Sequence, residues 1–383
     1  MTTTAPRRRL RAARIVAAAL AVIVIGGSIG LGYLRFPPSS YGAMDATDRA
    51  AFDDLSTQFE AFRAHAGDLW DVEYRYDTRP LILVRAPDAT DARIPGYQYA
   101  YVVNGGDAAR GLLGATPVDF PDAMGLDDVV VTKVLGSATL ATSAPINFTD
   151  VDLGDATVLA FRFNADRMDH PEVGLEFSYF SMHEAFHIDK QADWSFDRRD
   201  PDRPWEAVRS PEEFDTLRVE AQILDAVDAA RPAQTSEEEY RRLARDLVAV
   251  RLARIEQSPN VAGQENVEAI EGTARYLEAR YADLTHSAGR AEPLPERFLA
   301  EEIDIARQDP AEWQQYLEYR LYYETGRRVC ALLDQLAPGW KTLIEPPPVG
   351  EELTPFDILE RTVGPIEELT LDQVRDIGSS YGS

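Results

Sequence analysis

Residues 176–187 read EFSYFSMHEAFH, a stretch without glycine or proline, inside a helix that we expect over 173–192. His183 and His187 lie four residues apart in it, so they share one helical face at about 5–6 Å. Two imidazoles placed in this way can bind one metal ion with bonds of about 2.0–2.1 Å. Glu184, beside the first histidine, can take a proton from an attacking water. This HExxH pattern therefore predicts the helix at the centre of a hydrolytic site.

A catalytic zinc ion needs a third protein ligand and keeps one position open. The chain offers three candidates, which are Glu271, Glu268 and Asp193. Asp193 lies where the metzincin pattern HExxHxxGxxH has its third ligand, but Lys190 replaces the glycine of that pattern. Glu268 and Glu271 share a helix that we expect over 264–283. Their azimuths differ by about 60°, so the two cannot easily face one ion together.

Residues 271–276 read EGTARY, and together with the HExxH pattern this segment resembles the gluzincin metallopeptidases. In the M1 and M61 aminopeptidase-like branches, the glutamate of such a segment on a second helix is the third zinc ligand. The resemblance implies that His183, His187 and Glu271 bind one zinc ion per chain. It also implies that Glu184 is the general base.

The chain differs from those branches in two respects. In M1 enzymes the ligand glutamate follows soon after HExxH, whereas here residues 188–270 intervene and encode about two further helices. The GxMEN-type segment, which binds the free amino terminus of a substrate, is absent from the sequence. The resemblance therefore covers two short motifs and does not imply aminopeptidase specificity.

Attack on a carbonyl also requires a group that stabilises the oxyanion, commonly a tyrosine, histidine or arginine. Tyr319, Arg320, Tyr322 and Tyr323 cluster in a helix that we expect over 310–336. We select Tyr323 as the expected stabiliser. The alternative is that these rings only pack in a helical core.

Together these residues favour a zinc-dependent metallopeptidase that cleaves a peptide or protein substrate. The alternative is a catalytically inactive, zincin-like surface protein with a binding or scaffolding role. All the core catalytic residue types are present, which favours the enzyme. The sequence leaves open the cleavage preference, endopeptidase or exopeptidase action, and the oligomeric state.

Charge and cysteine content exclude other classes of protein. The chain carries 65 acidic and 39 basic side chains, a net charge of −26, which argues against nucleic acid as a partner. Its single cysteine, Cys330, excludes an intramolecular disulfide and a Cys₄ zinc site. The 383 residues allow two or three domains with a sizeable core.

The amino terminus predicts a membrane segment. Five arginines precede the uncharged stretch 15–34, IVAAALAVIVIGGSIGLGYL, which would span about 30 Å as a helix. The positive-inside rule then predicts a single-pass anchor in the cell membrane, with the chain from about residue 36 onward outside the cytoplasm. A cleaved signal peptide, followed by secretion, is the alternative.

We therefore expect an α+β fold, with an N-terminal transmembrane helix, a mixed sheet region and a mainly helical, zincin-like catalytic region. The predicted parts are a basic cytoplasmic tail (1–14), a signal anchor (15–34), a linker (35–45), the α/β part of the catalytic domain (46–165), its helical part with HExxH (166–345) and a C-terminal tail (346–383).

Periodicity and turn signals predict the elements within these parts. The expected strands are Leu81–Arg85, 97–104, 129–134 and 157–163. The last of these precedes the HExxH helix, an order that fits a sheet whose edge strand could pair with an extended peptide. Further helices are expected over 46–66, from caps at Ser210 and Ser236 to about 230 and 257, and over 295–308, 355–362 and 370–377.

Overall fold

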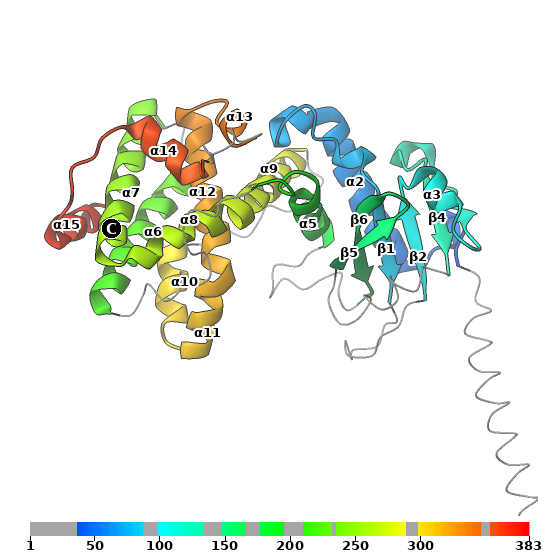
Figure 1. Ribbon diagram of the computed structural model, residues 1–383, viewed down its shortest axis with the longest axis horizontal. Helices are drawn as coiled ribbons and strands as arrows, with labels where there is room; N and C mark the ends of the chain where they lie inside the picture. Colours follow the sequence, from blue (N-terminus) through cyan, green and yellow to red (C-terminus); the bar gives the residue numbers. More distant parts are fainter. Residues whose placement is uncertain are drawn as a thin grey trace, which may run out of the picture. The chain divides into compact units, whose positions relative to one another are not determined.

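The structure, a computed structural model, describes residues 37–86, 98–133, 148–165, 177–194, 210–231, 235–288, 298–345 and 353–382. Its contacts group into two compact units (Figure 1). The sheet unit comprises Met1–Arg49 and Pro80–Asn164, and the helical unit comprises Ala50–Arg79 and Ala165–Ser383. The helical unit therefore includes a segment that precedes the sheet in the sequence.

The described part of the sheet unit contains one six-stranded sheet with the order β3-β4-β2-β1-β6-β5. Strands β1 and β6 pair in parallel, with Leu83 opposite Phe161, and the other neighbours are antiparallel. The strands are β1 (Leu81–Arg85), β2 (Tyr99–Val103), β3 (Thr116–Pro117), β4 (Val129–Thr132), β5 (Phe148–Leu153) and β6 (Ala156–Phe163).

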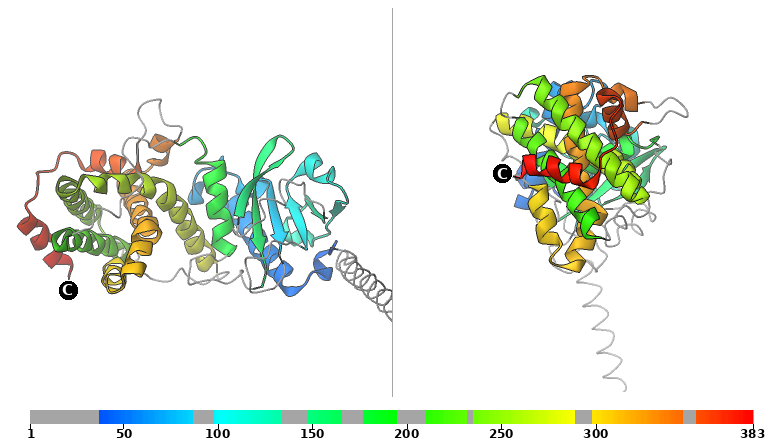
Figure 2. Two further views of the ribbon diagram at one scale, coloured as in Figure 1. Left: turned by 60° about the horizontal axis from the view of Figure 1, so that its bottom comes forward. Right: turned by 90° about the vertical axis from the view of Figure 1, so that its left-hand side faces the viewer.

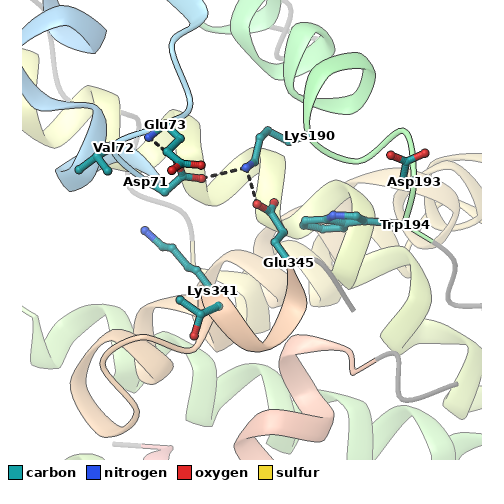
Figure 3. A pocket seen from close by; sticks show the side chains of 9 residues that line it. Asp71, Val72, Glu73, Lys190, Asp193, Trp194, Lys341 and Glu345 are labelled. Carbon is teal, nitrogen blue, oxygen red and sulfur yellow. Dashed lines mark hydrogen bonds and ion pairs between the residues drawn. The ribbon is translucent and has the colours of Figure 1, made fainter. Parts of the chain in front are cut away.

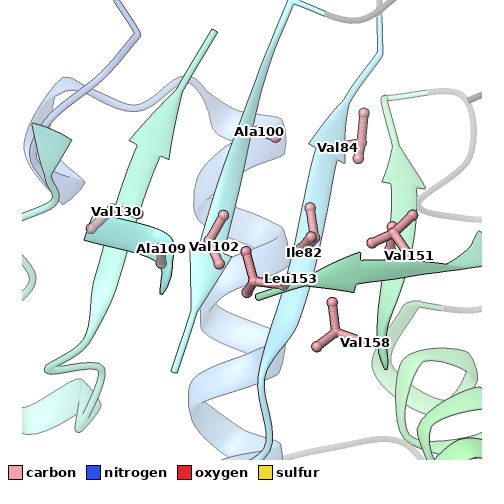
Figure 4. Close-up of a cluster of buried hydrophobic side chains, with 10 residues drawn as sticks. Ile82, Val84, Ala100, Val102, Ala109, Val130, Val151, Leu153 and Val158 are labelled. Carbon is pink, nitrogen blue, oxygen red and sulfur yellow. The ribbon is translucent and has the colours of Figure 1, made fainter. Parts of the chain in front are cut away.

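The central strands consist mainly of β-branched, aliphatic and aromatic residues, which favour a pleated sheet. Every residue of β1, β2 and β4 is buried, Arg85 included, so both faces of the sheet are covered there and the strands show no alternation of apolar and polar residues. Figure 4 shows one such face, on which Ile82, Val102 and Val130 come from neighbouring strands. Ala109, on the short helix α3 (Gly106–Arg110), packs against the same cluster.

The described part of the helical unit is built from helices, of which α6, α7, α11, α14 and α15 begin at a side-chain cap. The Ser210 hydroxyl accepts from the Glu213 amide while the Glu213 carboxylate accepts from the Ser210 amide, which is a capping box. The main helices are α2 (Ala46–Leu69), which belongs to this unit from Ala50 onward, α5 (Phe177–Asp189), α6 (Pro211–Ala230), α7 (Glu237–Gln257), α8 (Gln264–Val267), α9 (Thr273–Ser287), α10 (Leu299–Ala306), α11 (Pro310–Gln315), α12 (Leu321–Leu336), α13 (Lys341–Ile344), α14 (Pro355–Val363) and α15 (Leu371–Tyr381).

Two π-helical turns interrupt this succession of helices. The first, η7 (Glu268–Gly272), joins α8 to α9, and the second, η8 (Tyr316–Arg320), joins α11 to α12. Helix α12 packs against both η7 and α9, and α9 in turn packs against α5 (Figures 1 and 2). The packing of α5, α9 and α12 brings HExxH close to the segment 271–276.

The predicted fold class is wrong in its membrane component. The structure is mixed α/β, 65% helical, with one sheet. Among the described helices, none is long and apolar enough to cross a membrane. The predicted span over 15–34 lies outside the described residues, and the location and membrane partner inferred from it remain predictions.

The sequence also missed part of the sheet. Strand β6 matches the strand expected over 157–163 and lies between β1 and β5. In the described sheet, the edges are β3 and β5, neither of which was predicted. Two aspartates in β5, Asp150 and Asp152, weaken its strand signal.

Candidate metal centre

The two histidines of the HExxH pattern lie on α5, as the sequence predicts. Their rings are 4.8 Å apart between centroids. The His183 side chain is 2% exposed and that of His187 is 21% exposed, so the pair is open to solvent at its His187 end. A metal ion bound here would therefore have the protein core on its His183 side and would be accessible to solvent from its His187 side.

Glu271 meets both histidines from the turn η7. Its Oε2 atom lies 3.3 Å from Nε2 of His183 and 3.4 Å from Nε2 of His187. These distances exceed the usual 2.7–3.2 Å of an N–H···O hydrogen bond. They equal the edges of a tetrahedron with metal–ligand bonds of about 2.0–2.1 Å, which are about 3.3–3.4 Å long. The Glu271 oxygen is thus spaced from each histidine nitrogen as two ligands of one zinc ion would be.

The other ring nitrogen of each histidine has an acceptor. Nδ1 of His183 lies 2.6 Å from Oε1 of Glu278, and Nδ1 of His187 lies 2.5 Å from Oε1 of Gln191. With the Nδ1 proton directed at these oxygens, each imidazole would bind a metal through Nε2. Both Nε2 atoms lie near Oε2 of Glu271.

Gln191 does more than orient His187. Its Nε2 donates to the backbone carbonyl of Ile270, at 2.9 Å, and to Oγ1 of Thr273, at 2.8 Å. The carbonyl can only accept, so the amide must present Oε1 to His187. The same side chain thus connects the second histidine to the turn that carries Glu271.

A buried ion-pair chain supports the first histidine. Glu278 accepts from Arg275, whose Nε donates to Oε1 of Glu324 at 2.9 Å. Burial raises the pKa of Glu278, but the Arg275 charge and the His183 hydrogen bond outweigh it and lower that pKa. Glu278 therefore stays ionised and can hold the Nδ1 proton of His183.

Charge at the centre favours a cation. Burial lowers the pKa of His183, but hydrogen bonds with Glu271 and Glu278 outweigh burial and raise it to about 10. Burial raises the pKa of Glu271, but both histidines lower it well below its usual range. A positive charge between these groups, such as a metal ion, is therefore favoured electrostatically.

Glu184 and Tyr323 border the same centre. Glu184 and the two histidines form a group whose ligand atoms lie within 4.8 Å of one another. Burial raises the pKa of Glu184, although the histidine charges act in the opposite direction. The Tyr323 ring stacks on His183, with centroids 5.4 Å apart and planes at 9°. Burial, together with the charge of Glu271 and a hydrogen bond with it, raises the pKa of Tyr323.

The two other candidate ligands lie elsewhere. Glu268 is buried, and its carboxylate accepts from Arg251 at 2.9 Å, from Gln264 at 2.7 Å and from Thr325 at 2.5 Å. Asp193 is exposed in the turn after α5 and lines a separate cavity. Of the three candidates, the structure brings only Glu271 to the histidines.

The sequence prediction missed three residues around the candidate metal centre, although their spacing contained a signal for them. Gln191 is four residues after His187, one further turn along the histidine face. Arg275 and Glu278 follow Glu271 at the i+4 and i+7 positions of one helical face. A search for polar residues along these two faces would have found all three.

Comparisons of the chain with protein-family models, with curated proteins and with solved structures found no match. The metal centre is therefore interpreted from its own geometry and from the two sequence motifs.

Proposed function

We propose that this chain is a zinc-dependent metallopeptidase. The proposal rests chiefly on one observation, the spacing of Oε2 of Glu271 at 3.3 and 3.4 Å from the two histidine Nε2 atoms. A His₂Glu donor set is one of those that hold catalytic zinc with an open fourth position. The peptide bond as substrate follows from the resemblance to the gluzincins.

The roles of the side chains follow from their positions. When bound, zinc would lower the pKa of a water molecule and polarise a substrate carbonyl. Glu184 would accept a proton from the attacking water and deliver it to the leaving amine. Its raised pKa suits this exchange, because a base that must return its proton works best with a pKa nearer neutrality.

Tyr323 would steady the oxyanion that develops on the substrate carbonyl. The pKa of its hydroxyl is raised, so the hydroxyl keeps its proton and can donate it in a hydrogen bond. Stacking on the His183 ring holds the phenol beside the metal ligands. Gln191, Glu278 and Arg275 would position the ligands without touching the substrate.

The proposal is tested by following cleavage of a mixed peptide library by the zinc-loaded full chain. Glu184→Gln is expected to retain zinc and to lose at least about 100-fold in kcat/KM, because the general base is removed. Tyr323→Phe is expected to retain zinc and to lose about 100-fold in kcat.

Zinc content by mass spectrometry and folding by circular dichroism serve as controls for both variants. A zinc-loaded, folded wild type that cleaves no peptide in the library would contradict the proposal and favour a binding role. Cleavage at the wild-type rate by Glu184→Gln would contradict the assignment of the base.

A further inference from the structure

The described part of the helical unit contains a cavity, of about 450 Å³, that the proposed hydrolysis does not use. None of the three proposed metal ligands lines it. Its walls come from the connection after α2, from the turn after α5, and from α13 with the residue that follows (Figure 3). A volume of this size is typical of small-molecule sites.

One wall of this cavity is an ion-pair cluster in which a single ammonium group meets two carboxylates. Nζ of Lys190 lies 2.9 Å from Oδ2 of Asp71 and also pairs with Glu345. Oε1 of Glu345 accepts from the Trp70 indole at 3.2 Å. These groups brace three segments against one another and have little capacity left for a ligand.

Lys341 differs from Lys190 because its ammonium lies among aromatic rings. Nζ is 5.1 Å from the ring centroid of Trp70, 4.9 Å from that of Tyr276 and 5.9 Å from that of Trp340. Such rings attract a cation through their faces. Nζ donates one hydrogen bond, of 3.1 Å, to the Trp70 carbonyl.

The remaining N–H groups of Lys341 find no acceptor in the described part of the chain, and no carboxylate there lies within ion-pair distance of Nζ. Burial lowers the pKa of Lys341, which reflects the cost of holding an ammonium away from water. An anionic group in the cavity would supply both the missing acceptor and the missing charge.

The opposite side of the cavity offers the complementary groups. Figure 3 shows Asp193 and Trp194 on one side of this view and Lys341 on the other. The Asp193 side chain is exposed and has no hydrogen-bond or ion-pair partner among the described residues. It can therefore accept from an ammonium, while the Trp194 ring offers an apolar surface.

We propose that this cavity binds a zwitterionic amino acid or short peptide, with its carboxylate at Lys341 and its ammonium toward Asp193. The inference rests on the proposed function for the source of such a ligand, because peptide hydrolysis releases free carboxylates and amines. The binding itself needs no turnover.

The test is isothermal titration calorimetry of the full-length Glu184→Gln chain with the dipeptide Leu-Leu. The expected result is saturable binding that weakens at least about tenfold when the peptide is amidated at its carboxyl end or acetylated at its amino end. Removal of zinc with a chelator should leave this binding in place.

Variants locate the binding site. In the same background, Lys341→Met should remove the preference for the free carboxylate, whereas Lys133→Met, in the sheet unit, should keep it. Equal affinities for Leu-Leu and its amide, no saturable binding, or an unchanged preference in Lys341→Met would each overturn the inference. The comparison of Leu-Leu with its amide decides the question even where Lys341→Met does not fold.

Failure of this inference is distinct from failure of the proposed function. Peptide cleavage by the wild type together with no Leu-Leu binding would overturn only the cavity assignment. Leu-Leu binding in a chain that cleaves no peptide would overturn only the peptidase proposal.

Discussion

Gln191 is the residue that most closely links the two halves of the candidate metal centre. From the turn after α5 it accepts from His187, and it donates to Ile270 and Thr273 on either side of Glu271. These three hydrogen bonds fix the orientation of the Gln191 amide, which packing alone would not do. We infer that it sets the distance between the second histidine and the third ligand.

Replacement of Gln191 by leucine should therefore weaken zinc binding. Partners of ligating histidines typically contribute about 10–100-fold in metal affinity, and we expect a loss in that range. The measurement is competition for zinc against a chromophoric chelator, with thermal unfolding followed in parallel.

Gln58 provides a matched control at the other end of α5. It is fully buried and hydrogen bonds Ser178 at 2.7 Å and Ser181 at 3.1 Å, far along the helix from His187. Gln58→Leu should lower stability by about 1–3 kcal/mol and leave zinc affinity within about threefold. Equal zinc affinities for the two leucine variants would contradict a positioning role for Gln191.

At the scale of single residues, the sequence predicted those site residues that are defined by their spacing along one helix. The HExxH residues are defined by one helical turn, and EGTARY added Glu271 through its resemblance to the gluzincins. Helical spacing alone could not decide between Glu271 and Glu268, because the partner of Glu268 is Arg251 on another helix. The residue spacing within one helix does not indicate which residues of another helix contact it.

The crossing of η7 and α12 determines where Glu271 lies. Gly272 and Gly326 meet there, and a Cβ on Gly272 would lie 2.5 Å from the Cα atom of Gly326. The atoms that this Cβ would clash with belong to the backbone, so they cannot relieve the clash by rotation as a flexible side chain could. The glycine after Glu271 thus permits a close approach that α12 and η7 require.

Gly272→Ala should separate the two helices and displace Glu271. We expect a loss of about 2–4 kcal/mol in the free energy of unfolding, together with weaker zinc binding. Gly42→Ala is the control, because nothing lies within 4 Å of its added Cβ, and it should change stability by less than about 0.5 kcal/mol. Denaturant unfolding and zinc titration measure both effects. Wild-type behaviour of Gly272→Ala would refute this account of the crossing.

Helices and central strands were largely predictable at the element scale. Leu81–Arg85 has its predicted bounds, and the caps at Ser210 and Ser236 begin helices as expected. The π-helical turn η7, which packs against α12, was not predictable from helical periodicity. The sheet edges were missed because short or charged strands depend on their neighbours for pairing.

Within the helical unit, buried ion pairs hold distant segments together. Arg251 donates to Glu220 and Glu268, and Arg254 also pairs with Glu220. Burial raises the pKa of Glu220, but the two arginine charges outweigh it and lower that pKa from 4.5 to about 2. These arginines lie on α7 and the carboxylates on α6 and η7, so the cluster ties three elements together.

This depressed pKa predicts the sign of a pH effect. Glu220 stabilises the fold fully above pH 4.5, and the contribution is lost as the pH falls toward about 2, because the unfolded chain then binds the proton more readily. Glu220→Gln should remove that dependence and lower stability at neutral pH by roughly 3 kcal/mol, since two buried arginines lose a partner.

Urea unfolding of both chains between pH 2.5 and about 7 measures the effect. Glu239→Gln is the control, because Glu239 pairs with Arg242 at the surface and should change stability little. A wild type whose unfolding free energy does not fall below pH 4.5 relative to Glu220→Gln would contradict the assignment.

At the scale of the whole molecule, the sequence predicted a sheet region followed by a helical one. The inclusion of Ala50–Arg79 in the helical unit could not be predicted, because it depends on contacts such as that of Gln58 with Phe177, 119 residues away. Likewise, the net charge of −26 gave no sign that arginine–carboxylate pairs are buried inside this acidic chain.

The central claim is that His183, His187 and Glu271 bind one zinc ion. Anomalous X-ray scattering at the zinc edge, from crystals of the zinc-loaded chain, tests it most directly. We predict one strong peak about 2.0–2.2 Å from both Nε2 atoms and a Glu271 carboxylate oxygen, and no peak at Glu268. No zinc at that position in the zinc-loaded protein, or zinc held there without Glu271, would contradict the account.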